Sequence, residues 1–473
     1  MLLRQTLLYL PAQLIGPFAL FVAAVVWTHL LPPGAYGTLM LVMAAQELIF
    51  GFGLAWLSLT VLRYRDSFER GEGAARFRRA EAAMLYGSIL LQALAVVVIL
   101  PFFDRPTPQL IGVAAVFIVS RSLLNHLAER ARAGGEIMWY TIAQTSGPLV
   151  GFLLSLLLTK WFGASPAVAL SGYAIVQMIV LPFVWLRAGA VFKPAMPTRE
   201  LVEPLKRYGM PLLLSSVGSW VAMNGIRLVV DKMQGETALG LMSVGWGLGQ
   251  RLASTVAMLV TAAAFPMAVK AFNAGDRDGA MDQLAQNGVL LISLLAPTFA
   301  GLQLVDDELV KFMIAQPYWR ETIAILPLAV LSGVVRNVRV HYADQVYLLY
   351  EKTNWLLVIT ATEAVATLVG AAVGASLNGV VGAVTGALIA HIVTAIVVFA
   401  HGMMTLGLRI RWFDLARIGV ATIAMSFVVS LVTMDGSLWR LVFAIALGVA
   451  IYSAALMALF PEMIGKLRRA VAF

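Results

Sequence analysis

Apolar stretches long enough to cross a membrane recur from one end of the chain to the other, and this feature constrains the fold more than any other. A helix needs about 20 apolar residues to cross the hydrocarbon core, and 60% of the 473 residues are hydrophobic. Only 12% are charged, against about 25% in soluble domains. Because hydrocarbon offers no partners to backbone N–H and C=O groups, such spans must be helices. The sequence therefore predicts an all-α polytopic membrane protein.

About fourteen transmembrane helices fit the apolar pattern. The first resembles a signal peptide, but its apolar run continues to about Leu31 without a clear cleavage site, so we interpret it as a retained span. The predicted spans are 6–29, 38–62, 82–103, 109–127, 138–159, 167–186, 208–229, 237–268, 284–304, 322–346, 354–374, 380–404, 415–433 and 440–460.

The positive charge is distributed unevenly between the two sides of these spans. With a cytoplasmic N-terminus, the inside segments hold most of the Lys and Arg residues, and the densest are 63–79, 187–207 and the tail with Lys466, Arg468 and Arg469. The positive-inside rule then predicts a bacterial inner-membrane protein with both termini in the cytoplasm. The net charge of +9 is explained by topology, so it does not indicate a nucleic-acid partner.

Short matches suggest an internal repeat. Ala35-Tyr36-Gly37 follows the first span and Ala238-Leu239-Gly240 follows the seventh, while Pro11 and Pro211 open those two spans. Because six spans separate the copies, both halves insert the same way up, which predicts parallel repeats with a substrate path between them. The predicted organisation is a six-helix N-lobe at 1–190, a cytoplasmic linker at 191–207, a six-helix C-lobe at 208–405, and two C-terminal helices with a basic tail at 406–473.

Five arginines lie within predicted spans, namely Arg121, Arg227, Arg251, Arg336 and Arg339. Each costs roughly 2.5–3.5 kcal/mol at the centre of a membrane helix, so all five must face water, a partner or a substrate. Guanidinium groups suit phosphate oxygens. Helical spacing places other polar and aromatic residues on the arginine faces, and these are Asn125, Asn224, Trp220 and Tyr347. The pattern predicts an electropositive cavity that suits phosphate groups and sugar rings; the family resemblance described below implies that these belong to a pyrophosphate and a glycan.

An alternative for each arginine is a structural ion pair or a side chain that reaches the headgroups. Glu47, Asp344 and Glu363 are the candidate acids, and the same three could couple transport to an ion. Arg227 also has Asp231 one turn away. The tyrosines could equally form an interfacial aromatic belt.

Signals of enzyme chemistry are weak. The chain has no cysteine, its five histidines show no metal spacing within one helix, and no phosphate-binding loop precedes a helix. Asp306-Asp307 could be a catalytic pair of a membrane glycosyltransferase or polymerase, but a short interfacial turn suits the pair better. We therefore predict no catalytic site, no metal, no cofactor and no ATP site, and leave coupling to Na⁺, H⁺ or Cl⁻ open.

Three segments resemble a known superfamily. They are Leu31-Pro-Pro-Gly-Ala35-Tyr36-Gly37, Ala238-Leu-Gly240, and an eighth span that runs from Gly249-Gln-Arg251 to Ala264-Phe-Pro266. With the helix pattern they resemble the polysaccharide flippases of the multidrug/oligosaccharidyl-lipid/polysaccharide exporter superfamily, which are related to lipid II flippases. The resemblance implies flipping of undecaprenyl-pyrophosphate-linked oligosaccharide from the cytoplasmic to the periplasmic leaflet by alternating access, for O-antigen, capsule or exopolysaccharide. It also implies that Arg251 meets the pyrophosphate.

The main alternative is a multidrug or small-molecule cation antiporter of the same superfamily. Such exporters favour a buried acid, whereas the first predicted span has no carboxylate. We expect the partners to be the lipid-linked glycan and the bilayer, with polysaccharide polymerase machinery as a further candidate. Since a two-lobed path needs only one chain, we expect a monomer.

Overall fold

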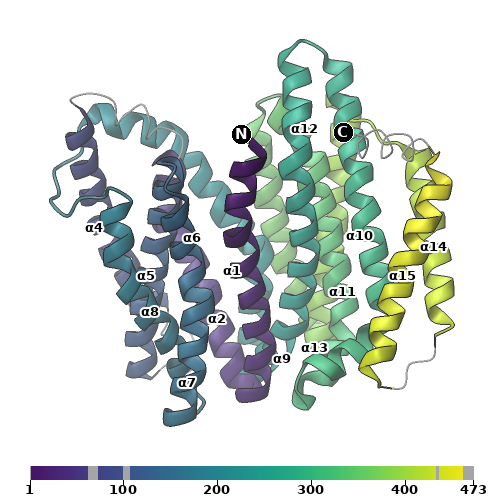
Figure 1. Cartoon of the computed structure of the whole chain (residues 1–473), viewed down its shortest axis with the longest axis horizontal. Coiled ribbons are helices and arrows are strands. Elements are labelled where there is room, and N and C mark those ends of the chain that lie inside the picture. The colour runs from purple at the N-terminus through teal and green to yellow at the C-terminus, as the bar shows by residue number, and fades with distance from the viewer. Residues whose placement is uncertain (1, 62–72, 100–106, 433–435, 462–473) are drawn as a thin grey trace. The chain divides into compact units, whose positions relative to one another are not determined.

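A computed structural model describes residues 2–61, 73–99, 107–432 and 436–461, and every regular element in these ranges is helical. Figure 1 shows the elements in chain order. They are α1 Leu2–Leu30, α2 Pro33–Phe50, η1 Gly51–Ala55, α4 Ala74–Ile99, α5 Pro108–Ala133, α6 Ile137–Ser146, η4 Gly147–Gly151, α7 Phe152–Phe162, α8 Pro166–Arg187, α9 Arg199–Asn273, α10 Arg277–Met313, η5 Gln316–Tyr318, α11 Trp319–Val338, η6 Arg339–Ala343, α12 Asp344–Leu349, α13 Thr353–Leu406, α14 Trp412–Ser430 and α15 Leu438–Leu459.

The described helices confirm the predicted fold class. Eleven segments are long and apolar enough to cross a membrane. Two of them contain two helices each, because α9 breaks at Gly235 (φ 86°) and α13 breaks at Asn378 and Gly379 (φ 52°). A positive φ suits glycine because it has no Cβ. Counting both breaks and adding the apolar part of α1, 15–30, gives the predicted fourteen spans.

Local sequence explains where several helices begin. Thr107 and Ser165 cap α5 and α8, and each hydroxyl accepts a hydrogen bond from the backbone N–H three residues later (3.2 and 3.3 Å). Proline follows each cap at the first helical position, where its missing N–H has no consequence. Asp276 caps α10 in the same way at 2.8 Å.

The third C-lobe span, α10, is longer than predicted. It continues nine residues beyond the expected end at 304, so Asp306 and Asp307 lie in its last turns and not in an interfacial turn. Lys311 forms an ion pair with Asp307 one turn along the helix. A helical pair of this kind extends the helix past the apolar run.

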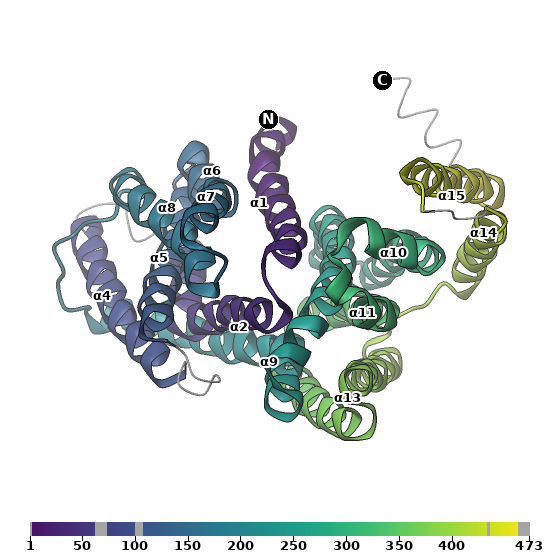
Figure 2. The ribbon, with the colours of Figure 1, turned by 90° about the horizontal axis from the view of Figure 1, so that it is seen from below.

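Residue contacts divide the chain into two compact units, Met1–Asp231 with Gly235–Gly240, and Lys232–Gln234 with Leu241–Phe473. In unit 1, α5 packs against α4, α6 and α8 around buried residues that include Leu54, Leu85 and Leu124. In unit 2, α10 packs against α11 and α14, and α11 packs against α13. Figure 2 shows α14 and α15 running side by side. The predicted lobe boundaries stay a prediction.

The two segments that the sequence pairs as repeat copies lie against each other within unit 1. A Cβ on Gly37 would stand 2.8 Å from the backbone nitrogen of Gly240, and a Cβ on Gly240 would overlap the carbonyl oxygen of Pro33. Only glycine permits so close an approach of two backbones. The basic segment 63–72 and Lys466, Arg468 and Arg469 lie outside the described residues, so the orientation in the membrane stays a prediction.

Candidate functional site

Charged residues of the unit 2 spans gather around Glu363. Its Oε2 atom lies 2.8 Å from Nη2 of Arg339, and its Oε1 atom lies 3.3 Å from Nε of Arg336. Asp344 completes the group, with Oδ2 3.8 Å from Nη2 of Arg339. Two arginines and two acids make this group, which we call the Glu363 cluster, electrically neutral.

The Glu363 cluster is closed to its surroundings. Glu363 and Arg339 are 0% and 2% exposed, and Arg336 is 9% exposed. His391 is also buried and lies 3.9 Å from Glu363, while its Nδ1 atom is 2.7 Å from the hydroxyl of Ser332. Arg336 and Arg339 therefore form structural ion pairs in this structure, which is the alternative that the sequence left open.

A second closed cluster lies in unit 1 and was not predicted. Glu81 accepts a hydrogen bond from Arg130, and its Oε1 atom is 2.9 Å from Nε2 of His126. Arg130 also donates to the carbonyl oxygens of Ala188 and Gly189 at 3.0 Å. The sequence missed Arg130 because the apolar run ends near 127, whereas α5 continues to Ala133. The available signal was an acid and an arginine at adjoining ends of two consecutive predicted spans, Glu81 just before 82–103 and Arg130 just after 109–127.

A third polar group in unit 1 differs from both clusters, and we call it the Glu47 group. Asn224 donates to Oε2 of Glu47 at 3.4 Å and accepts from Arg227. The charge of Glu47 also acts on Arg121. Glu47 is exposed and Arg121 is half-buried, although both lie in apolar spans. The three charged side chains carry a net charge of +1.

Arg121 is incompletely satisfied. Its Nη1 atom is buried and has no hydrogen-bond partner among the described residues. A buried donor without a partner costs about 1–3 kcal/mol. This N–H group is therefore suited to donate a hydrogen bond to an additional anionic ligand. Gly147 lies next to this atom, since a Cβ added to Gly147 would be 3.7 Å from Nη1.

Each of three π-helical turns lies beside one of these groups. η1 starts at Gly51, one turn after Glu47, η4 starts at Gly147 beside Arg121, and η6 starts at Arg339. A π turn widens the helix by one residue and is frequent at functional sites.

The remaining predicted residues lie in different surroundings. Trp220 is buried and donates to the carbonyl oxygen of Ala44 at 2.8 Å, which anchors α9 to α2. Tyr347 is 1% exposed, and its hydroxyl is 2.8 Å from Nδ1 of His401. Asn125 is half-buried on α5, one turn from Arg121. Arg251 is half-buried on α9 and belongs to unit 2.

Outside the spans, the segment between α13 and α14 is held by Arg409. Its guanidinium forms ion pairs with Asp282 (2.9 Å) and Asp278, and its carbonyl oxygen accepts from Tyr342. The hydrogen bond to Asp282, together with both acidic charges, raises the pKa of Arg409 above its ordinary value. The group is exposed, so we treat it as a surface ion pair. Within the described ranges, no three His, Cys, Asp or Glu side chains are arranged to hold a metal.

The sequence places this geometry in a known family. Residues 28–324, more than half of the chain, match the model of a family described as polysaccharide biosynthesis protein. The chain belongs to this polysaccharide biosynthesis protein family. The family match includes Arg121, Arg227 and Arg251 and ends before the Glu363 cluster. No curated protein matches the sequence.

Solved structures resemble the chain over more of its length than the family model covers. The chain is similar to lipid II flippase MurJ in an inward closed conformation, with a TM-score of 0.75 and 12% identity over 98% of this chain and 100% of that one. It is also similar to an inward-facing multidrug resistance MATE family transporter of the MOP superfamily (TM-score 0.64, 17% identity, 85% and 98% covered). A MOP superfamily transporter from Pyrococcus furiosus gives a TM-score of 0.57 at 19% identity, with 85% and 95% covered. At these identities the likenesses show the fold alone.

Proposed function

We propose that the chain flips undecaprenyl-pyrophosphate-linked oligosaccharide from the cytoplasmic to the periplasmic leaflet, for O-antigen, capsule or exopolysaccharide. The observation that carries the proposal is the Glu47 group, an exposed acid and two arginines within membrane spans, with Nη1 of Arg121 unsatisfied. Membership of a polysaccharide biosynthesis family and a fold shared with a lipid II flippase support it.

The chemistry of the Glu47 group suits a diphosphate. A guanidinium presents planar N–H donors that match phosphate oxygens, and charged hydrogen bonds are roughly twice as strong as neutral ones. Arg121 offers a donor that the protein leaves unused. Arg227 and Asn224 supply further polar groups beside the same acid. In the proposal, Arg121 and Arg227 together bind the two phosphates.

Glu47 explains how the cargo can leave. When the site is empty, the carboxylate is the anion nearest Arg121 and is hydrogen-bonded by Asn224. An incoming phosphate displaces Glu47, and the returning carboxylate competes with the phosphate after the site has opened to the other side. A cytoplasm-negative membrane potential adds about 2.3 kcal/mol per charge per 100 mV in favour of exporting an anion. Coupling to Na⁺, H⁺ or Cl⁻ stays a prediction.

Flipping by the purified full chain in liposomes tests the proposal. The substrate is a fluorescent polyprenyl-pyrophosphate oligosaccharide, and a membrane-impermeant quencher reports the fraction in the outer leaflet. We expect Arg121→Ala to slow flipping at least tenfold, because one charged hydrogen bond contributes about 1.5–3 kcal/mol. Arg132→Ala is the matched control, since Arg132 lies on the same helix, is 43% exposed and forms a local ion pair with Glu129. It should flip at the wild-type rate.

Arg251→Ala, measured in the same assay, tests the residue that the family resemblance favours. Equal rates for wild type and Arg121→Ala would refute the role of the Glu47 group. A chain that leaves the lipid-linked sugar in place but exchanges organic cations for protons would be the multidrug antiporter. Deletion in the native host gives the cellular counterpart: if the chain is the flippase, its loss should trap the lipid-linked precursor in the cytoplasmic leaflet.

A further inference from the structure

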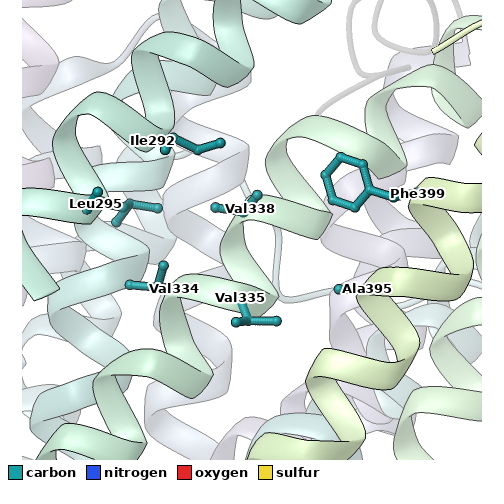
Figure 3. A pocket seen from close by; sticks show the side chains of 8 residues that line it. Ile292, Leu295, Val334, Val335, Val338, Ala395 and Phe399 are labelled. Atoms are coloured by element: carbon teal, nitrogen blue, oxygen red, sulfur yellow. The ribbon is translucent and has the colours of Figure 1, made fainter. Parts of the chain in front are cut away.

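A pocket in unit 2 has no role in the proposed transport site. It has a volume of about 270 Å³, is partly open, and lies between α10, α11 and the second half of α13. Figure 3 shows its walls, with Ile292 and Leu295 from α10, Val334 and Val338 from α11, and Ala395 and Phe399 from α13. Every side chain that lines it is apolar.

The pocket faces away from the charged residues of the same helix. Val334 and Val338 each lie two residues from Arg336, which places them roughly 160° around the helix axis from it at 3.6 residues per turn. Arg336 is turned toward Glu363 instead. The ligand of the pocket is therefore not bound through this arginine.

The exposed residues beside the pocket show which medium it faces. On α10, Leu294 lies between two of the lining residues and is 43% exposed. On α13, Ile396 and Val397 follow Ala395 directly and are 63% and 60% exposed. Exposed apolar side chains in the middle of membrane spans face hydrocarbon. The medium next to this pocket is therefore the acyl region of the bilayer.

Neither water nor empty space suits the pocket. A buried water needs two to four polar partners, and the lining side chains offer none. An unfilled apolar cavity forfeits packing contacts and destabilises the fold. A cavity of about 150 Å³ accommodates benzene, with six carbons, so about 270 Å³ accommodates a segment of about ten carbons.

We propose that this pocket binds one hydrocarbon chain of a bilayer phospholipid, which packs between α10, α11 and α13 as a structural part of unit 2. Phospholipid is the most concentrated hydrocarbon around these spans, and mass action favours the most concentrated ligand that fits. The occupant contributes by apolar burial alone. The proposal does not depend on the transported cargo.

Filling the pocket from the protein side tests the proposal. Ala395→Phe places a ring where the acyl chain would lie. Ala361→Phe makes the same change at an exposed position of α13 and is the matched control. The full-length proteins are purified, delipidated in detergent and titrated with dioleoyl phosphatidylglycerol while Tm is recorded, and native mass spectrometry counts the retained lipids.

We expect wild type and Ala361→Phe to gain the same Tm from the lipid, and Ala395→Phe to gain about half as much or less and to retain one lipid fewer. If Ala395→Phe does not fold, Ala296→Leu fills the pocket from α10 with a smaller change. Equal gains in wild type, control and pocket variants would overturn the proposal. So would a wild type that responds to a polyprenyl phosphate but not to phosphatidylglycerol, which would assign the pocket to the tail of the cargo.

Discussion

At the scale of single residues, charged side chains in the spans fall into two kinds. Arg339 and Arg130 have carboxylate partners in closed, buried clusters, and Arg339 lies 2.8 Å from Glu363. Arg339 and Arg121 both keep buried N–H groups without a hydrogen-bond partner among the described residues, so this feature does not separate the two kinds. Arg121 differs because the acid whose charge acts on it, Glu47, is exposed. Closed pairs contribute to the folded state only while both partners are present, whereas an exposed acid can be replaced by another anion.

We therefore expect Arg339→Ala to destabilise the protein by about 3–5 kcal/mol, because it leaves Glu363 buried with one cation fewer. Thermal unfolding of the detergent-purified protein measures the loss. Arg132→Ala removes a partly exposed local pair with Glu129 and should cost at most about 1 kcal/mol. A similar Tm for both variants would show that the Glu363 cluster does not stabilise the fold.

How far the sequence predicts these residues depends on where the partners lie. The acids Glu47, Asp344 and Glu363 were identified because a charge inside an apolar run must be compensated. Sequence alone does not pair Arg339 with Glu363, since that choice depends on how two helices rotate against each other. Arg130 was missed because it lies beyond the apolar run, in a helical end that Glu81 and two carbonyl oxygens hold in place.

At the scale of elements, small residues and π turns decide how closely helices approach. The predicted apolar windows locate the spans, because about 20 residues are needed whatever the packing, but several helices continue beyond these windows, such as α10 and α5. The π turns η1, η4 and η6 were not predicted, since no apolar period distinguishes a five-residue widening from regular helix. Gly37 and Gly240 show such a close approach, but it does not test the predicted repeat, which stays a prediction.

Gly240→Ala should therefore destabilise the protein, because the added Cβ meets the backbone of Pro33, which cannot move like a side chain. We expect a loss of about 1–3 kcal/mol, measured by thermal unfolding. Gly87→Ala is the control, because nothing lies within 4 Å of a Cβ at that helical position. Its Tm should stay equal or rise. An unchanged Tm for Gly240→Ala would mean that the two backbones are not in contact.

At the scale of the whole molecule, fourteen spans among the described helices, an even number, predict that both termini lie on one side of the membrane. The positive-inside rule predicts that this side is the cytoplasm. Because the chain has no cysteine, single cysteines report topology without background. We expect Lys160→Cys, at an exposed end of α7, to react with an impermeant maleimide added from the periplasm. Lys193→Cys, in the segment after α8, should react only after lysis. The reverse pattern would invert the proposed transport direction.

The chain positions of the charged groups have a consequence for biogenesis. Glu81 and Arg130 lie on consecutive spans, α4 and α5. In unit 2, Arg339 in η6 and Glu363 in α13 likewise lie on consecutive spans. Each closed cluster can thus neutralise its charges within one helical hairpin as the hairpin leaves the translocon. Glu47, Arg121 and Arg227 come from α2, α5 and α9, so their charges meet only after most of unit 1 has been synthesised. The Glu47 group therefore needs three helices that are far apart in the sequence, whereas each closed cluster needs only one hairpin.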